Sequence, residues 1–333
     1  MKVFLTGGTG FIGQPLAAAL LKRGWDVHAL VRRPESREAQ ALARLGATLV
    51  QGDVTDRASL VAPMQGAGVV INNAGWYALG IGGKEAEAQM QAINVDGARH
   101  VLETALEAGV PRIAHVSSIV AWGDTGKTVR DETYTRQAPP PTPYERTKTA
   151  AHALAEALQT QGAPVVMACP GSVHGPGDHT TLGDLIRLYV RGLHPPIAMF
   201  ADYGRAVVHV DDCAEGIAAV AEKGRLGESY ILSGGNATYR EIFSIINETP
   251  GGMRIRAYLP DFAAKPFCWA AEPVERWLGL PITFSAEMAQ GATSCYFFSG
   301  AKAERELGIQ CRDVRQTLLD TLAEERRRAG KRR

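Results

Sequence analysis

The chain has 333 residues, of which 45% are hydrophobic and 21% charged, and its formal net charge at pH 7 is +1. These values are typical of a globular protein that buries a large core in one α/β domain, with or without a smaller lobe. A net charge near zero provides no overall field for nucleic acid or membranes, so we expect neither as a partner.

The five cysteines are scattered and include no Cys-x-x-Cys pair, which argues against a disulfide framework or a zinc site. The first apolar run starts at Val3, which leaves no room for a signal peptide. No run approaches the roughly 18 apolar residues of a membrane-spanning helix. We therefore expect a cytoplasmic protein without a bound metal. Its basic end, residues 324–333, is interpreted as a solvated helix end, with a nucleic-acid or lipid tether as the alternative.

Short β-branched runs alternate with amphipathic stretches through the first half of the chain. Strands are predicted at 3–6, 27–31, 48–51, 69–72, 112–117 and 165–168, and helices at 16–23, 38–45, 88–108 and 144–159. Strands that are hydrophobic on both faces and alternate with helices indicate a parallel sheet covered on both sides. We therefore predict an α/β fold, with a doubly wound Rossmann-type sheet and a smaller C-terminal substrate-binding lobe.

This alternation breaks after Pro170, where glycine and proline become frequent. It returns at 206–233, where two short strands flank a helix at 212–222. We therefore assign residues 1–170 and 206–233 to the Rossmann domain, and residues 171–205 and 234–333 to the substrate-binding lobe.

A glycine-rich loop at residues 6–13 follows the first strand and opens the first helix. Glycines in this position let the backbone approach a pyrophosphate, which then sits on the helix N-terminus. The glycines fit both a G-x-G-x-x-G and a G-x-x-G-x-x-G spacing, starting from Gly8 or Gly7. The residues predicted to hold a dinucleotide here are Gly7, Thr9, Gly10, Phe11, Ile12 and Gly13.

Arg32 and Arg33 end the second strand, about 20 residues beyond the loop. An acid there would bind the ribose 2′-hydroxyl of NAD, whereas an arginine suits the 2′-phosphate of NADP. We expect NADP (NADPH) instead of NAD, bound by Arg32; the alternative is two solvated arginines. Asp53 and Val54 follow the third strand, and Asp53 is predicted to accept from the adenine amino group or to cap the helix near Arg57.

Tyr144 and Lys148 lie four residues apart at the start of a predicted helix. Thr142 and Glu145 form a capping-box pattern, and Pro143 occupies the first helical position. The two side chains therefore share one face of the first turns. A nearby ammonium favours phenolate, so we expect Lys148 to lower the pKa of Tyr144 and make it an acid or base.

Ser117 and Ser118 end a buried strand, where strand ends in such sheets point at the ligand crevice. A serine there could hold a substrate oxygen beside Tyr144; the alternative is that both serines cap the following turn. Asn94 lies in a helical pattern with no local reason for an asparagine. It is a candidate for holding a water or a backbone carbonyl near Lys148.

Together these segments resemble the extended short-chain dehydrogenase/reductase family, which also contains nucleotide-sugar epimerases and dehydratases. The matching pieces span nearly the whole chain: Thr-Gly-x-x-Gly-x-x-Gly at 6–13, Gly-Asp-Val at 52–54, Asn-Asn-Ala-Gly at 72–75, Asn-Val-Asp-Gly at 94–97, Val-Ser-Ser at 116–118, Tyr-x-x-x-Lys at 144–148, Pro-Gly-Ser-Val-His-Gly-Pro-Gly at 170–177, His-Val-Asp-Asp at 209–212 and Ala-Lys-Ala-Glu-Arg-Glu-Leu at 301–307. The resemblance is strongest to the dihydroflavonol-reductase and hydroxysteroid-dehydrogenase-like branch.

The resemblance implies that Lys148 binds the nicotinamide-ribose hydroxyls and supports Tyr144, and that Ser118 is the catalytic serine. The further residues that it places at the cofactor are Asn73, Ala74, Gly75, Pro170 and Val173. His209 and Asp211 resemble lobe-joining and helix-capping residues. Helices around Asn94 and Tyr144 commonly pair in the family, which implies a homodimer.

The substrate class is where the family divides. Sugar-nucleotide enzymes carry an asparagine where this chain has Ser172, whereas Arg205 matches their phosphate-binding arginine. Aromatic residues are frequent in the expected cleft and in the segment 269–298, namely Trp76, Tyr77, Trp122, Trp269, Trp277, Phe284, Tyr296, Phe297 and Phe298. Such a lining suits an apolar, aromatic or polycyclic small molecule, although core packing explains some of these residues equally well.

The favoured hypothesis is NADP-dependent hydride transfer to a ketone or aldehyde, with the proton supplied by Tyr144. The second is a nucleotide-sugar epimerase or dehydratase that retains its cofactor. The third is a non-catalytic NADPH-sensing regulator built on the same fold.

Overall fold

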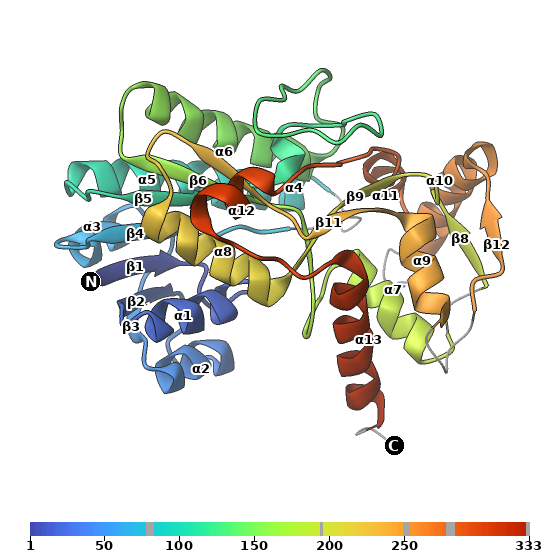
Figure 1. The fold of residues 1–333 in the computed structure, drawn as a ribbon, viewed down its shortest axis with the longest axis horizontal. Helices are drawn as coiled ribbons and strands as arrows, with labels where there is room; N and C mark the ends of the chain where they lie inside the picture. Colours follow the sequence, from blue (N-terminus) through green and yellow to red (C-terminus); the bar gives the residue numbers. More distant parts are fainter. Residues whose placement is uncertain (78–82, 194–195, 249–253, 278–283, 331–333) are drawn as a thin grey trace.

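Seven parallel strands form the central sheet of the molecule, in the order β10-β6-β5-β4-β1-β2-β3 (Figure 1). The computed structural model describes residues 1–77, 83–193, 196–248, 254–277 and 284–330. The strands of this sheet are β1 (Lys2–Thr6), β2 (Asp26–Val31), β3 (Thr48–Gln51), β4 (Val69–Asn72), β5 (Ile113–Val116), β6 (Val165–Pro170) and β10 (Ser229–Leu232). The central strands are almost entirely buried. This agrees with their continuous apolar runs in the sequence, because both faces of such strands are covered.

Helices cover both faces of this sheet, because alternate strand residues point to opposite sides. Val3 and Leu5 of β1 face a core that includes α1 (Gly13–Lys22), α2 (Arg37–Leu45) and α8 (Val210–Lys223). Phe4 faces the other core, with α3 (Ala58–Met64), α5 (Gly97–Glu107) and α6 (Pro143–Thr160). The doubly wound Rossmann-type fold is therefore confirmed.

The long helix expected at 88–108 consists of three parts. It comprises α4 (Lys84–Met90), a π-helical segment η1 (Gln91–Asp96) and α5. A π-bulge widens one turn and changes the apolar periodicity very little, so the sequence pattern did not reveal it. Asn94 lies in this widened turn, and π-bulges occur frequently at functional sites.

The smaller lobe contains two short sheets. Strands β7 (Ser172–His174), β9 (Gly204–His209) and β11 (Gly235–Thr238) form one, and β8 (Ile197–Met199) pairs with β12 (Ala257–Leu259) in the other. The helices of this part of the chain are α7 (Thr181–Val190), α9 (Tyr239–Glu248), α10 (Asp261–Trp277), α11 (Ala286–Ala292), α12 (Ala301–Leu307) and α13 (Val314–Gly330). Strand β10 joins the main sheet as part of the returning unit at 206–233, while β9 pairs with β7 and β11. The division of the chain into two domains stays a prediction.

The edge strand β10 is covered by side chains from two other segments. The N–H of Ile231 donates to Glu132 Oε1 at 2.9 Å, and Lys302 Nζ donates to the Ser229 carbonyl at 2.8 Å. The same amino group lies 4.7 Å from the centre of the Tyr230 ring. Among the helices in the described ranges, none is both long and apolar enough to cross a lipid bilayer.

Candidate active site

The ends of three central strands are joined by a chain of buried side chains. Thr6 Oγ1 donates to Asn72 Oδ1 at 2.9 Å, and Asn72 Nδ2 contacts His115 Nδ1 at 3.2 Å. Thr6 Oγ1 also accepts from the N–H of Ala74 at 3.0 Å. These contacts fix the carboxyl ends of β1, β4 and β5 against one another, at the edge where ligands bind in open parallel sheets.

The glycine loop has room for backbone and very little else. Gly7 has φ +68°, and a Cβ added there would lie 2.5 Å from the Asn73 carbonyl oxygen. At Gly13 it would lie 2.1 Å from the Gly7 carbonyl oxygen, whereas at Gly8 it would meet only side chains, at 3.2 Å or more. The structure therefore favours the spacing Gly7, Gly10, Gly13. No side chain caps the N-terminus of α1, so its first N–H groups suit a phosphate.

The remaining predicted dinucleotide contacts lie around this loop. Asn73 Nδ2 donates to the Gly7 carbonyl at 3.3 Å, and the ring of Phe11 contacts His179 edge-on at 5.4 Å. The other predicted residues take these places: Thr9, Gly10 and Ile12 in the loop, Ala74 and Gly75 after β4, Pro170 at the end of β6 and Val173 in β7. This arrangement fits a dinucleotide laid across the strand ends.

Arg32 and Arg33 are exposed directly after β2, and the ion pairs found within the described residues include neither of them. Arg37, exposed in the first turn of α2, adds a third cation that the sequence argument missed. Asp53 Oδ1 accepts from the N–H and the hydroxyl of Thr55, both at 2.9 Å. Asp53 therefore closes a turn. The alternative that it caps α3 near Arg57 is wrong, because no side chain caps that helix. Val54 beside it is buried.

Lys148, the cation of the predicted catalytic set, is buried, with 8% of its surface exposed. Its Nζ donates to the Val116 carbonyl at the end of β5, at 3.1 Å. Burial lowers the pKa of Lys148 to about 8. Burial also lowers the pKa of His115 and that of His152, the latter to about 4, and the charge of Lys148 adds to both effects. The imidazoles of His115 and His152 near Lys148 are therefore neutral.

Tyr144 lies one turn before Lys148, beside Ser118. Thr142 caps the helix as expected, because its hydroxyl accepts from the Glu145 N–H at 3.2 Å. The hydroxyl of Ser118 favours the ionised form of the Tyr144 phenol, and the ring of Tyr77 packs edge-on against Tyr144 with centroids 4.7 Å apart.

The expectation that Lys148 lowers the pKa of Tyr144 is wrong for this structure. Burial and the neighbouring Tyr77 raise the pKa of Tyr144, while the Ser118 hydroxyl opposes that rise. The reason is that the phenol is buried, and burial disfavours its charged form. Tyr144 is consequently protonated at neutral pH.

Ser117 and Ser118 have different hydrogen-bond partners. Ser117 is buried, and its hydroxyl contacts His152 Nδ1 at 2.8 Å. Ser118 caps the following turn, as the alternative expected: its hydroxyl accepts from the Val120 N–H at 3.4 Å at the start of a short 3₁₀ segment, η2 (Ile119–Ala121). It also acts on the phenol of Tyr144. His152, which the sequence argument missed, continues the four-residue spacing from Tyr144 and Lys148 along one helix face.

Asn94 holds the loop after β4 against the catalytic helix. Its Oδ1 accepts from the Trp76 N–H at 2.7 Å, and its Nδ2 donates to the Trp76 carbonyl at 2.9 Å. The Nδ2 group also lies 3.1 Å from Thr147 Oγ1, between Tyr144 and Lys148. Asn94 therefore holds a backbone carbonyl, that of Trp76, while its expected closeness to Lys148 stays a prediction.

Arg205 brings a positive charge to the substrate side of Tyr144. Its guanidinium lies 5.5 Å from the ring centres of both Tyr239 and Tyr296, and its Nη2 donates to the Gly291 carbonyl at 3.2 Å. Its Nε is buried without a hydrogen-bond partner in the structure. The charge of Arg205 acts on the phenol of Tyr144 and favours its ionised form.

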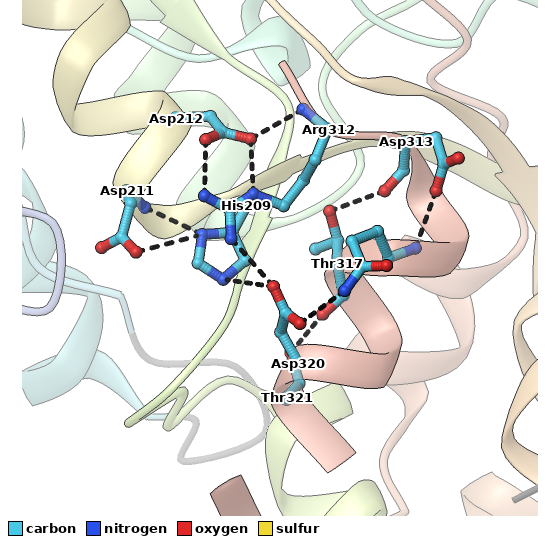
Figure 2. Close-up of polar contacts among 9 residues, drawn as sticks. His209, Asp211, Asp212, Arg312, Asp313, Thr317, Asp320 and Thr321 are labelled. Atoms are coloured by element: carbon cyan, nitrogen blue, oxygen red, sulfur yellow. Dashed lines mark hydrogen bonds and ion pairs between the residues drawn. The ribbon is translucent and has the colours of Figure 1, made fainter. Parts of the chain in front are cut away.

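A polar cluster beside the site joins α8 to the last helix (Figure 2). His209 Nδ1 accepts from the Asp211 N–H at 3.1 Å and so caps α8. Arg312 binds Asp212 with two nitrogens at 2.9 Å each and Asp320 of α13 at 2.8 Å. The interpretation of the His209 segment as lobe-joining and helix-capping agrees with these contacts. Lys331–Arg333 of the basic end lie outside the described residues.

The predicted aromatic lining is only partly at the site. Tyr77 and Tyr296 lie beside Tyr144 and Arg205, but Trp122 is buried against His152 at 5.1 Å. Phe298 packs with Trp122 in the core, and Phe297 is buried too. Trp269 and Trp277 are exposed on α10. Core packing therefore explains several of these residues, as the alternative had it.

Comparison with known proteins identifies the family. The model of the NAD dependent epimerase/dehydratase family matches residues 3–233, which is more than half of the chain. The chain belongs to this family. Its members bind a nicotinamide cofactor, and the chain is an oxidoreductase of the extended short-chain dehydrogenase/reductase type.

Several relatives match this family member over almost its whole length. A protein of Synechocystis sp., provisionally named a dihydroflavonol 4-reductase, is 30% identical and aligns over 96% of this chain and 93% of its own. The 4-hydroxy-2-methyl-3-oxo-4-farnesyl-3,4-dihydroquinoline-1-oxide ketoreductase of Stigmatella aurantiaca is 29% identical, over 97% and 96%. Sterol demethylase protein B of Methylococcus capsulatus is 28% identical, over 97% and 98%.

The fold is shared with solved structures. The crystal structure of gox2253 is 30% identical, covers 98% of both chains and superposes with a TM-score of 0.82. These matches confirm the predicted family and its dihydroflavonol-reductase and hydroxysteroid-dehydrogenase-like branch.

Substitution of Gly13 by alanine should weaken dinucleotide binding, because the new Cβ would displace the backbone of the loop. Loss of one or two N–H to phosphate bonds corresponds to on the order of 100-fold in affinity. Fluorescence titration with NADPH and NADH measures this. Gly8→Ala is the matched control, since its Cβ meets only side chains, and it should stay within about threefold. Equal affinities for the two variants would refute the assignment of the loop.

Substitution of Lys148 by methionine should stabilise the protein at pH 7, because a buried cation is removed. The net gain should be about 1–3 kcal/mol, after the loss of the Val116 hydrogen bond. Since the pKa of Lys148 is about 8 when folded and higher when unfolded, the native charge is already lost as the pH rises above 8. The stability difference should therefore shrink between pH 8 and about 10.5. Urea unfolding across this range measures it, with exposed Lys22→Met as a control expected to show no such trend.

Proposed function

We propose that this oxidoreductase reduces a ketone or aldehyde of an apolar small molecule, using NADPH. The observation that carries the proposal is the placement of protonated Tyr144 near Ser118 at the carboxyl edge of the sheet, one turn before Lys148, whose amino group is fixed by the Val116 carbonyl. When bound, the nicotinamide supplies a hydride to the carbonyl carbon. Tyr144 then donates its proton to the carbonyl oxygen, and Ser118 holds that oxygen in place.

The surroundings of Tyr144 suit the donor direction. Its raised pKa keeps the proton on the phenol until negative charge develops on the substrate oxygen. After transfer, the phenolate is favoured by the Ser118 hydroxyl and by the charge of Arg205. Lys148, fixed by the Val116 carbonyl, would bind the nicotinamide ribose in this proposal.

The choice of NADPH rests on the end of β2. Arg32 and Arg33 are exposed there, and no acidic side chain occupies the position that binds the 2′-hydroxyl in NAD enzymes. Arg37 follows within the first turn of α2, so three cations surround the expected 2′-phosphate.

An apolar substrate is supported by the names of the relatives and by the aromatic side chains beside Tyr144. The relatives include a ketoreductase named for a farnesylated quinoline oxide and a protein named for sterol demethylation. Tyr77, Tyr239 and Tyr296 provide ring surface near Tyr144 and Arg205. The predicted homodimer stays a prediction.

A second candidate function, epimerisation or dehydration of a nucleotide sugar with retained cofactor, is favoured by one observation. Arg205 is a half-buried cation whose charge acts on Tyr144, and no carboxylate partner is found for it within the described residues. Such a group would suit a substrate phosphate. Net oxidation of NADPH during turnover separates the two functions, because a retained cofactor shows no net change.

Replacing Tyr144 by phenylalanine should lower kcat for NADPH-dependent reduction by about 10²–10⁴-fold, because the proton donor is lost. NADPH affinity should change little. The rate is followed as loss of NADPH absorbance with a panel of apolar ketones. Tyr258→Phe, distant from the site on β12, should keep the wild-type rate. A Tyr144→Phe variant that retained full kcat would exclude the proposed mechanism.

Replacing Arg32 by alanine should weaken NADPH binding by about 10–100-fold and leave NADH binding unchanged, because only NADPH carries the 2′-phosphate. Calorimetric titration with both cofactors measures the ratio. Arg44→Ala, an exposed arginine at the other end of α2, is the matched control. A parallel loss for NADPH and NADH would contradict the role of Arg32.

A further inference from the structure

Helix α10 has apolar residues on both of its faces. Ala264 and Cys268 point inward and pack with Phe200 of the lobe and Ala289 of α11. The outward face is also apolar, although a helix on a protein surface normally carries polar residues there. The residues that form this outward face recur every three to four positions: Phe262, Pro266, Trp269, Ala270, Pro273 and Trp277.

Three aromatic rings stand out from this face. Phe262 is 82% exposed, Trp269 65% and Trp277 84%. Large aromatic side chains are seldom left so exposed in water unless the surface has a partner. The spacing 262, 266, 269, 273, 277 places them along one continuous stripe, which we call the α10 stripe.

Exposed positive side chains lie around the α10 stripe. Lys265 lies between Phe262 and Trp269 on the same side of the helix and is exposed. Arg254 and Arg256, on the segment that leads through β12 into α10, are exposed as well. The outer side of this region therefore combines aromatic rings with positive charge.

The carboxylates of α10 are bonded to other parts of the lobe. Asp261 accepts from the Tyr203 hydroxyl at 2.7 Å. Glu272 and Glu275 accept from the N–H groups of Ala286 and Phe284, at 3.1 Å each. Glu272 and Glu275 thus hold the segment that begins α11, and all three acids are half-buried, whereas Lys265, Arg254 and Arg256 are exposed.

We propose that the α10 stripe docks on the surface of an anionic phospholipid bilayer. Tryptophan and phenylalanine side chains enter the interfacial layer of a membrane, and neighbouring lysine and arginine bind the anionic headgroups. The expectation of no membrane partner rested on the net charge and on the lack of a spanning run. Neither of these excludes a helix that lies on the surface.

Docking at this place brings the active site close to the membrane. Helix α10 packs on α11, whose Gly291 carbonyl binds Arg205, and Arg205 acts on Tyr144. In Figure 1, α10 and α11 lie on the same side of the lobe, at the end away from the N-terminus. A poorly soluble ketone could then pass from the bilayer to the site, an aspect that rests on the proposed function.

Vesicle binding tests the proposal with the full-length chain. Wild-type protein should co-sediment with phosphatidylcholine vesicles that contain phosphatidylglycerol, and its tryptophan emission should shift to the blue. The double variant Trp269→Ser with Trp277→Ser should bind about 100-fold more weakly, or about tenfold for each ring removed. Lys265→Glu keeps both rings and should bind anionic vesicles about tenfold more weakly. Val129→Ser, an exposed apolar position elsewhere, should bind as wild type does.

Five outcomes decide between the alternatives. Weaker binding by the two α10 variants, with wild-type reduction of a water-soluble ketone, supports docking. Absence of vesicle binding by active wild-type protein overturns it, as does equal binding by wild type and the double variant. Equal binding to neutral and anionic vesicles overturns the proposal that the membrane surface must be anionic. Self-association that the double variant abolishes, without vesicle binding, would assign the face to a second copy of the chain. Ketone reduction is measured separately, so its failure would refute the proposed function and leave the vesicle result intact.

Discussion

The amino group of Lys148 is held inside the protein by the carbonyl oxygen of Val116, and much of the site follows from this contact. The bond joins the first turns of α6 to the carboxyl end of β5, so the catalytic helix is positioned directly by the central sheet. The imidazoles of His115 and His152 are buried too, and their burial, together with the charge of Lys148, keeps them neutral. Tyr144, one turn earlier on the same helix, is thereby placed against Ser118 at the end of the same strand.

The sequence predicted the sheet well because parallel strands buried on both faces leave an unmistakable apolar run. The strands at 48–51 and 69–72 have the observed bounds, and the other main-sheet strands differ by only one or two residues. The π-helical turn at Asn94 could not be predicted, since one extra residue in a turn barely alters the apolar pattern. The pairing of β9 with β7 depends on long-range packing that a local pattern does not contain.

The site shows the same division between local and long-range information. The glycine loop, the Thr142 cap and the placement of Tyr144 before Lys148 are local features, and the structure has them where the sequence places them. The spacing of Tyr144 and Lys148 predicts a lowered pKa for Tyr144, whereas burial raises it. Spacing along a helix does not indicate how deeply a side chain is buried. Arg136 was missed for a similar reason: it binds Glu145 at 3.3 Å and the carbonyl of Ala121 at 3.2 Å, which lie on separate segments.

The contact between Glu132 and the N–H of Ile231 has a consequence for how copies of this chain behave at high concentration. An open sheet ends in a strand whose outer backbone groups can pair with another extended chain, and such edges start aggregation. At β10 this N–H is already bonded to a carboxylate, and Lys302 is bonded to the Ser229 carbonyl. A second chain would have to displace two charged side chains before it could extend the sheet at this edge, so growth of an intermolecular sheet from β10 is disfavoured.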